Sequence, residues 1–147
     1  MNTERNIISG EIHFKGDRII KCKSSIEKII YERLGIHYNI PLYYGSHSDD
    51  CIIIEYIKNS DVISSFFESG EELYYLVMLQ LLSVVEYIHS KGVLHTDLSN
   101  PENILYVKSN NRIIIIDFEG AIFDTNNPTF NDITTLKHDY RCIACIG

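Results

Sequence analysis

The stretch that decides the fold is YIHSKGVLHTDLSNPENILYV at Tyr87–Val107, together with RIIIIDFEGA at residues 112–121. The first stretch predicts the end of an apolar-striped helix, then a polar loop that contains Asp97 and Asn103, and then a short apolar strand. The second is a run of four isoleucines that ends at Asp117. A hairpin of the two strands returns Asp117 to the end at which the loop lies. We therefore expect Asp97, Asn103 and Asp117 to converge.

The three side chains suggest a metal-assisted site. Hard oxygen ligands such as those of Asn103 and Asp117 suit Mg²⁺, and the nearby carboxylate of Asp97 can orient or deprotonate a hydroxyl group. A carboxylate directly after four isoleucines would also be expensive to bury without a cation or several hydrogen-bond donors. Asp117 is therefore the strongest functional candidate.

Short strands are predicted on the N-terminal side of this region, separated by glycine turns. Apolar residues at helical spacing predict a helix that ends at Gly35, with Ser24 or Ser25 as its N-cap. Asp61 is a candidate cap for a further short helix that reaches Phe67. The strands are expected at residues 6–9, 11–15, 18–22, 42–44, 51–56, 104–108 and 112–116, and the longest helix at 71–90.

Composition limits the classes of protein to consider. A chain of 147 residues with 45% hydrophobic and 22% charged residues fits one globular domain. No apolar run approaches the roughly 18 residues of a membrane span, and no signal peptide is visible, so we expect an intracellular, cytoplasmic or nuclear protein without a membrane partner. The net charge of −7 argues against nucleic acid as a partner.

The four cysteines are expected to be free thiols, because nothing in the sequence indicates export. They are Cys22, Cys51, Cys142 and Cys145. The last two form a CxxC pair, which by itself cannot complete a tetrahedral zinc site, and we interpret them as small buried apolar residues.

The decisive stretch resembles the protein-kinase-like superfamily. YIHSKGVLHTDLSNPENILYV is similar to the end of the long kinase helix and the catalytic loop H-R-D-L-x-x-x-x-N, and RIIIIDFEGA to the strand that carries D-F-G. The resemblance continues towards the N-terminus. CIIIEYIKNSD at residues 51–61 resembles the kinase hinge, SSIEKIIYERLG at 24–35 the small-lobe helix, and DRIIKC at 17–22 the strand with the phosphate-contacting lysine.

The resemblance implies an α+β fold of two lobes around one cleft. The small β-rich N-lobe with one short helix would cover residues 1–57, and an abbreviated helical C-lobe would cover residues 58–147. Some of the short sequence motifs are also loosely similar to those of fungal kinase-like proteins and of aminoglycoside- and choline-type phosphotransferases.

The same resemblance implies roles for individual residues. Lys21 would contact the α- and β-phosphates of ATP and be held by Glu27, although Lys23 is a neighbouring alternative. Asp97 would align the acceptor hydroxyl, and Asn103 and Asp117 would hold Mg²⁺. The remaining cofactor contacts would come from Gly10, at the end of the glycine-rich loop, and from the hinge residues Glu55, Tyr56 and Ile57.

The sequence departs from the kinase pattern in several places. Only Gly10 remains of the glycine-rich loop, Glu119 replaces the glycine of D-F-G, and Thr96 replaces the usual arginine. The carboxylate of Glu119 could also reach the metal. The spacing from Asp97 to Asn103 is one residue longer than in the family. That extra residue, for which Asn100 is the natural candidate, could bulge outward harmlessly or pull Asn103 away from the metal.

Two functions follow. The favoured one is an ATP- and Mg²⁺-dependent phosphotransferase that acts on a hydroxyl group, on a protein Ser/Thr first and on a small molecule second. The alternative is a weak or inactive pseudokinase that works as a binding module, because the peptide-substrate platform is missing after Asp117. Such a module would associate with itself or with a partner kinase through its incomplete C-lobe.

Overall fold

The computed structural model describes residues 4–9, 12–63, 71–124 and 137–141. Its largest sheet has five antiparallel strands. In spatial order these strands are β1 (Glu4–Ser9), β2 (Ile12–Lys15), β3 (Arg18–Lys21), β5 (Cys51–Glu55) and β4 (Tyr43–Ser48). Helix α1 (Ser25–Leu34) connects β3 to β4 and packs on this sheet.

Helix α1 has the bounds that its sequence predicts. Ser24 is the N-cap residue, but its side chain makes no capping hydrogen bond to the backbone. Gly35 ends the helix with a φ of 69°, and its amide donates to the carbonyl of Tyr31. Glycine adopts a left-handed φ without strain, so the residue type at position 35 explains why the helix ends there.

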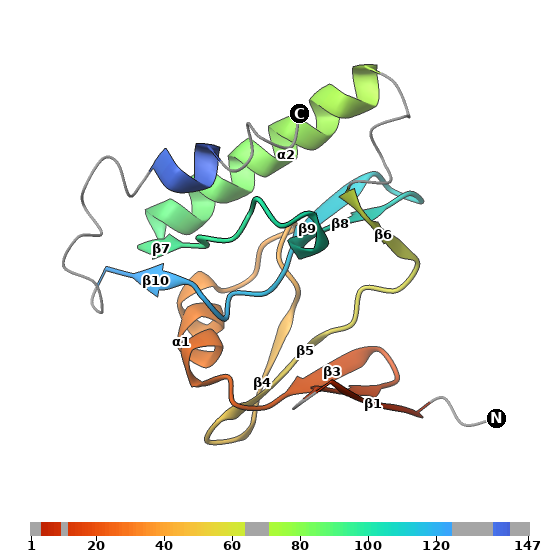
Figure 1. Ribbon diagram of the computed structural model, residues 1–147, viewed down its shortest axis with the longest axis vertical. Helices are drawn as coiled ribbons and strands as arrows, with labels where there is room; N and C mark the ends of the chain where they lie inside the picture. Colours follow the sequence, from red (N-terminus) through yellow and green to blue (C-terminus); the bar gives the residue numbers. More distant parts are fainter. Residues whose placement is uncertain (1–3, 10–11, 64–70, 125–136, 142–147) are drawn as a thin grey trace.

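The second half of the chain contains the long helix α2 (Glu71–Ser90), whose bounds are those predicted from its apolar stripe. Two small antiparallel sheets accompany it. One contains β6 (Ser60–Val62), β8 (Ile104–Val107) and β9 (Arg112–Ile115), and the other pairs β7 (Val93–Leu94) with β10 (Ile122–Phe123). Figure 1 shows α2 on the opposite side of the molecule from the five-stranded sheet, with the small sheets between them.

One apolar core joins the two halves. It includes Tyr31 from α1, Ile52 from β5, Leu81 from α2 and Phe118 just after β9, all at most 1% exposed. This shared core keeps the elements that carry polar side chains in fixed relation to each other. Within the described residues no helix has both the length and the apolar character needed to cross a membrane.

The predicted cap at Asp61 is wrong. Asp61 lies in β6, where it pairs with Tyr106 of β8. Pairing with a strand more than 40 residues away in the sequence overrides the local preference of an aspartate for a helix start. The rest of the short helix expected there, residues 64–67, lies outside the described residues.

The prediction of free thiols at Cys22 and Cys51 is also wrong, because a disulfide joins them. The two residues are 29 positions apart in the sequence, but β3 and β5 are neighbours in the sheet. The pairing of Lys21 with Ile52 places Cys22 beside Cys51 at adjacent strand ends. Cys142 and Cys145 lie outside the described residues.

Candidate active site

A buried ion pair joins the end of β3 to the first turn of α1. Lys21 Nζ lies 2.6 Å from Glu27 Oε1, and the two side chains are 15% and 1% exposed. Only three residues separate β3 from α1, so the last residue of the strand and the first turn of the helix stay close. The other carboxylate oxygen, Glu27 Oε2, is buried without a hydrogen-bond partner within the described structure.

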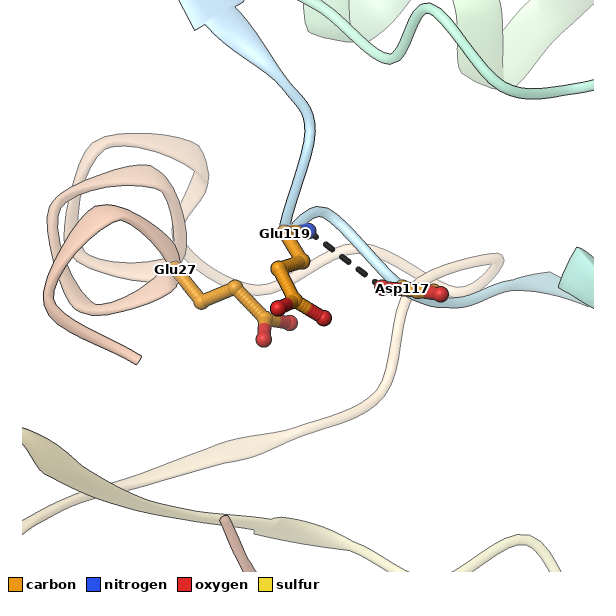
Figure 2. Close-up of side chains that lie close together, drawn as sticks. All are labelled: Glu27, Asp117 and Glu119. Atoms are coloured by element: carbon orange, nitrogen blue, oxygen red, sulfur yellow. Dashed lines mark hydrogen bonds between the residues drawn. The ribbon is translucent and has the colours of Figure 1, made fainter. Parts of the chain in front are cut away.

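Two further carboxylates approach the same ammonium group. Lys21 Nζ lies 3.5 Å from Asp117 Oδ1 and 3.8 Å from Glu119 Oε2. Figure 2 shows Glu27 and Glu119 directed towards each other, with Asp117 on the same loop as Glu119, and the ligand atoms of the three groups lie within 4.8 Å of one another. The Glu119 amide donates to Asp117 Oδ1 at 3.4 Å.

Asp117 has a φ of 66°, which is uncommon for a residue other than glycine. The backbone turns here, two residues after the end of β9 and just before the buried ring of Phe118. This turn brings the Asp117 carboxylate close to Lys21. In a continued strand the direction of the side chain would instead be set by the alternation of successive residues between the two faces of the sheet.

The site raises the pKa of both partners of the Lys21–Glu27 pair. Desolvation raises the pKa of Glu27 against the lowering effect of Lys21, and Asp117 and Glu119 raise it further. Burial alone would lower the pKa of Lys21, but Glu27, Asp117 and Glu119 together raise it overall. Burial and the charges of Glu27 and Asp117 raise the pKa of the Tyr31 hydroxyl, which has no hydrogen-bond partner within the described structure. The pKa of Glu27 is raised chiefly by desolvation, whereas the pKa of Lys21 is raised because carboxylates outnumber ammonium groups in the site.

The polar loop joins Asp97 to Asn103 directly. The Asn103 amide nitrogen donates to the backbone carbonyl and to the side-chain Oδ2 of Asp97, both at 3.0 Å. Asn100, the candidate for the extra residue, is the N-cap of the 3₁₀ helix η2 (Pro101–Asn103), where its side chain accepts a hydrogen bond from the Glu102 amide. The amide nitrogen of Asn103 is held by Asp97, and its Oδ1 has no hydrogen-bond partner among the described residues, so this oxygen can bind a ligand.

The side chains of His95 and Asp139 hold this loop in place through hydrogen bonds to its backbone. The His95 ring donates from Nε2 to the carbonyl of Ile116 at 2.8 Å and accepts at Nδ1 from the Asp97 amide at 3.1 Å, which requires the neutral ring with its proton on Nε2. Asp139 accepts from the amides of His95 and Thr96 at 2.9 and 2.8 Å. Both side chains are fully buried, so the structural role expected of His95 is confirmed.

Two cavities meet at Asp117. The larger, of about 480 Å³, is lined by Lys21, Glu27, Asn103 and Asp117, and by apolar side chains of β2, β3, β5 and β8. Its volume is within the usual range for small-molecule sites. The other, of about 410 Å³, is lined by Thr96, Asp97, Asp117, Glu119 and Gly120. Lys21 and Asp97 thus belong to different cavities that share one carboxylate.

The sequence matches the family profile of the protein kinase domain over residues 4–141. The chain belongs to this family. It is 42% identical over 84 residues to a probable myosin light chain kinase of Dictyostelium discoideum, covering 55% of this chain and 17% of that protein. It is 34% identical over 103 residues to serine/threonine-protein kinase D of Synechocystis, covering 67% of this chain and 20% of that protein. The chain therefore spans about a fifth of the length of these relatives.

The fold of this kinase domain also has a counterpart among solved structures. The Cydia pomonella granulovirus kinase superposes with a TM-score of 0.64 at 17% identity, covering 76% of this chain and 47% of that one. The likeness confirms the α+β kinase-like fold expected from the sequence.

The predicted hinge of the kinase domain lines the larger cavity. The amide of Glu55 donates to Leu42 and that of Tyr56 to Asp17, both at 2.8 Å, so neither is available to a ligand. The Ile57 amide has no such partner in the part of the chain that the structure describes. Gly10, the remaining predicted cofactor residue, lies outside the described residues.

The donor set of the cluster fits a divalent cation. Asp117 and Glu119 offer partly exposed carboxylate oxygens, Asn103 offers an amide oxygen, and Glu27 Oε2 is a buried oxygen that has no hydrogen-bond partner among the described residues. Hard cations such as Mg²⁺ prefer such oxygen ligands. The sequence indicates Asn103 and Asp117 as the metal pair and Glu119 as a carboxylate that could also reach the metal. The structure places Glu119 in the same cluster as Asp117, and its approach to Lys21 depends on the turn at Asp117.

Proposed function

We propose that this kinase domain is an ATP- and Mg²⁺-dependent phosphotransferase that acts on a hydroxyl group, with a protein Ser/Thr as the favoured acceptor. The observation that carries the proposal is the placement of Lys21 and Asp97 in two cavities that both include Asp117. One cavity can hold a nucleotide and the other an acceptor, with Asp117 where they meet. Phosphoryl transfer depends chiefly on such positioning and on charge stabilisation.

In this proposal the nucleotide binds in the larger cavity, which Lys21 lines. Lys21, fixed by Glu27, would contact the α- and β-phosphates, and a bound ion held by Asn103 and Asp117 would neutralise phosphate charge. The apolar side chains of Ile19, Ile54 and Leu105 line the same cavity and suit the faces of a flat base. We propose the Ile57 amide as the hinge donor to the base, because the preceding two amides are occupied.

The acceptor hydroxyl would bind in the second cavity, next to Asp97. Its Oδ2 accepts from Asn103, so the carboxylate is oriented within the loop. A fixed carboxylate at the wall of the second cavity can accept a hydrogen bond from an incoming hydroxyl and align it. Thr96 beside it donates to the Gly120 carbonyl at 3.0 Å, which ties this loop to the segment after Asp117.

The first test is the melting temperature of the full chain with ATP, with and without Mg²⁺. A ligand that binds only the folded state raises stability by mass action, so saturating Mg²⁺–ATP should raise the melting temperature. Asp117→Ala should abolish the Mg²⁺-dependent part of the shift. If millimolar nucleotide produces no shift in the wild-type chain, the proposed function is wrong.

The second test is phosphate transfer. Transfer of labelled phosphate to a Ser/Thr peptide mixture should be detectable and should fall by about 100-fold or more in Asp97→Asn, because alignment of the acceptor is lost. Transfer to small-molecule hydroxyls in place of peptides would move the acceptor assignment to the second class. Asp97→Asn with unchanged transfer would remove Asp97 from the proposal.

A binding module is the second candidate, favoured by one surface. Helix α2 exposes Tyr75, Leu76, Leu79 and Leu82, which recur on one side of the helix, with Leu79 66% exposed. A contiguous apolar surface of this kind is typical of an interaction site. Nucleotide binding without transfer, together with concentration-dependent association in sedimentation, would favour this candidate over catalysis.

A further inference from the structure

Glu119 adds a third carboxylate to the Lys21 site at the position where the kinase pattern has glycine. Its Oε2 lies 3.8 Å from Lys21 Nζ, and its side chain is 68% exposed, unlike the buried Glu27. Figure 2 shows it directed towards Glu27, within the cluster that also contains Asp117. Among the described residues, the Glu119 carboxylate makes no hydrogen bond that would hold the turn, and the bond to Asp117 comes from the Glu119 backbone amide.

The charge balance of the cluster is unfavourable for a nucleotide. Three carboxylates surround one ammonium group, which leaves a net charge of −2 when all are ionised. Among the described residues that line either cavity, Lys21 is the one lysine or arginine. A polyphosphate that enters without a cation therefore meets repulsion from the carboxylates, and it must also compete with Glu119 for Lys21.

We infer that Glu119 makes nucleotide binding depend strongly on a divalent cation. Without a cation, its carboxylate shares Lys21 and repels the phosphates. With a cation at the oxygen atoms of the cluster, that negative charge is compensated and Lys21 becomes available to the nucleotide. The inference rests on the proposed function. It assigns to Glu119 the difference between the affinity for ATP without a cation and the affinity for ATP with Mg²⁺.

The coupling is measured by calorimetric titration of ATP into the full chain, once with Mg²⁺ and once with a chelator. In Glu119→Gln, which removes the charge and keeps the size, metal-free ATP should bind about five- to tenfold tighter than in the wild type. The affinity for Mg²⁺–ATP should change by a smaller factor, because Asn103 and Asp117 would still hold the cation. The ratio of the metal-free to the Mg²⁺-loaded dissociation constant should therefore fall by about fivefold or more.

Two variants serve as controls. Glu119→Asp keeps the charge and should keep most of the wild-type ratio. Glu86→Gln removes one charge from the exposed side of α2 and should leave the ratio unchanged, which separates the local effect of Glu119 from the net charge of the chain. The melting temperature of each variant verifies that it is folded.

The possible outcomes separate this inference from the proposed function. If wild-type protein binds Mg²⁺–ATP but Glu119→Gln leaves the ratio unchanged, the inference is overturned and the proposed function stands. If Glu119→Gln weakens Mg²⁺–ATP as strongly as it strengthens metal-free ATP, Glu119 acts mainly as a metal ligand and the inference is again overturned. If no form of the chain binds ATP, both are rejected.

Discussion

At the scale of single residues, burial distinguishes Lys21 from its neighbour Lys23. Lys21 is largely buried and pairs with Glu27, whereas Lys23 is exposed and has a left-handed φ of 56° in the turn before α1. A buried ammonium group is stable only beside compensating carboxylates, and Lys21 lies beside those of Glu27 and Asp117.

This difference predicts unequal effects of two identical substitutions. Lys21→Met should weaken Mg²⁺–ATP binding by about 10- to 100-fold, because one charge-assisted contact to the phosphates is lost. Lys23→Met should stay within about twofold of the wild type. Titration calorimetry on both variants provides the measurement, and equal losses in the two would show that Lys21 has no special role.

At the scale of elements, α1 is held at both ends. Its first turn carries Glu27, and its last turn carries Arg33, whose guanidinium pairs with Asp124 directly after β10. Asp124 also donates its amide to the Gly92 carbonyl at 3.0 Å, and Tyr87 of α2 donates its hydroxyl to the carbonyl of Leu34. The segment from Asp117 to Asp124 and helix α1 are therefore fixed to each other and to the end of α2.

Gly92 lies at the crowded centre of these contacts. Its φ is 74°, and a Cβ atom there would lie 2.7 Å from Asp124 Oδ2 and 3.0 Å from Arg33 Nη1. Gly16 has a similar φ of 62° with nothing within 4 Å, which makes it a matched control.

Alanine at both glycines separates backbone strain from crowding. Gly16→Ala should lower the free energy of unfolding by about 1 kcal/mol, from left-handed strain alone. Gly92→Ala should lower it by about 1 kcal/mol more, because the Arg33–Asp124 pair must move. Denaturant unfolding of both variants measures the difference. Equal losses would mean that the ion pair adapts freely to the new methyl group.

At the scale of the whole molecule, Asp139 connects parts of the chain that are far apart in sequence. It is fully buried in the helical turn of residues 137–141, and it contacts His89 at the end of α2 as well as the His95 and Thr96 amides. Burial alone would raise the pKa of Asp139, but the hydrogen bonds from His89, Thr96 and His95 outweigh it and lower the pKa overall.

The lowered pKa of Asp139 predicts the acid sensitivity of the fold. A carboxyl group whose folded pKa is below its unfolded value of 3.8 adds stability above that pH, and the contribution is lost as the pH falls through the folded pKa. Asp139→Asn should lower the free energy of unfolding by about 2–4 kcal/mol at pH 7. It should also flatten the decline below about pH 4, as unfolding curves from pH 3 to 7 would show. An unchanged acid decline would point to other carboxylates.

Local patterns determined much of this protein. The bounds of helices α1 and α2, the glycine at the end of α1 and the hairpin of β8 and β9 were all predictable, because apolar periodicity and turn chemistry act over a few residues. The spaced polar residues Asp97, Asn103 and Asp117 also indicated the kinase family, which the match over residues 4–141 confirms.

Tertiary structure decided what depends on strands meeting across the chain. The bond between Cys22 and Cys51 exists because β3 lies beside β5, and Asp61 joins a sheet because β8 pairs with it. The approach of Glu119 to Lys21 likewise depends on a left-handed turn at Asp117 and on α1 holding Glu27 in place. Contacts between residues distant in sequence have no local signal, since packing of the whole core selects them.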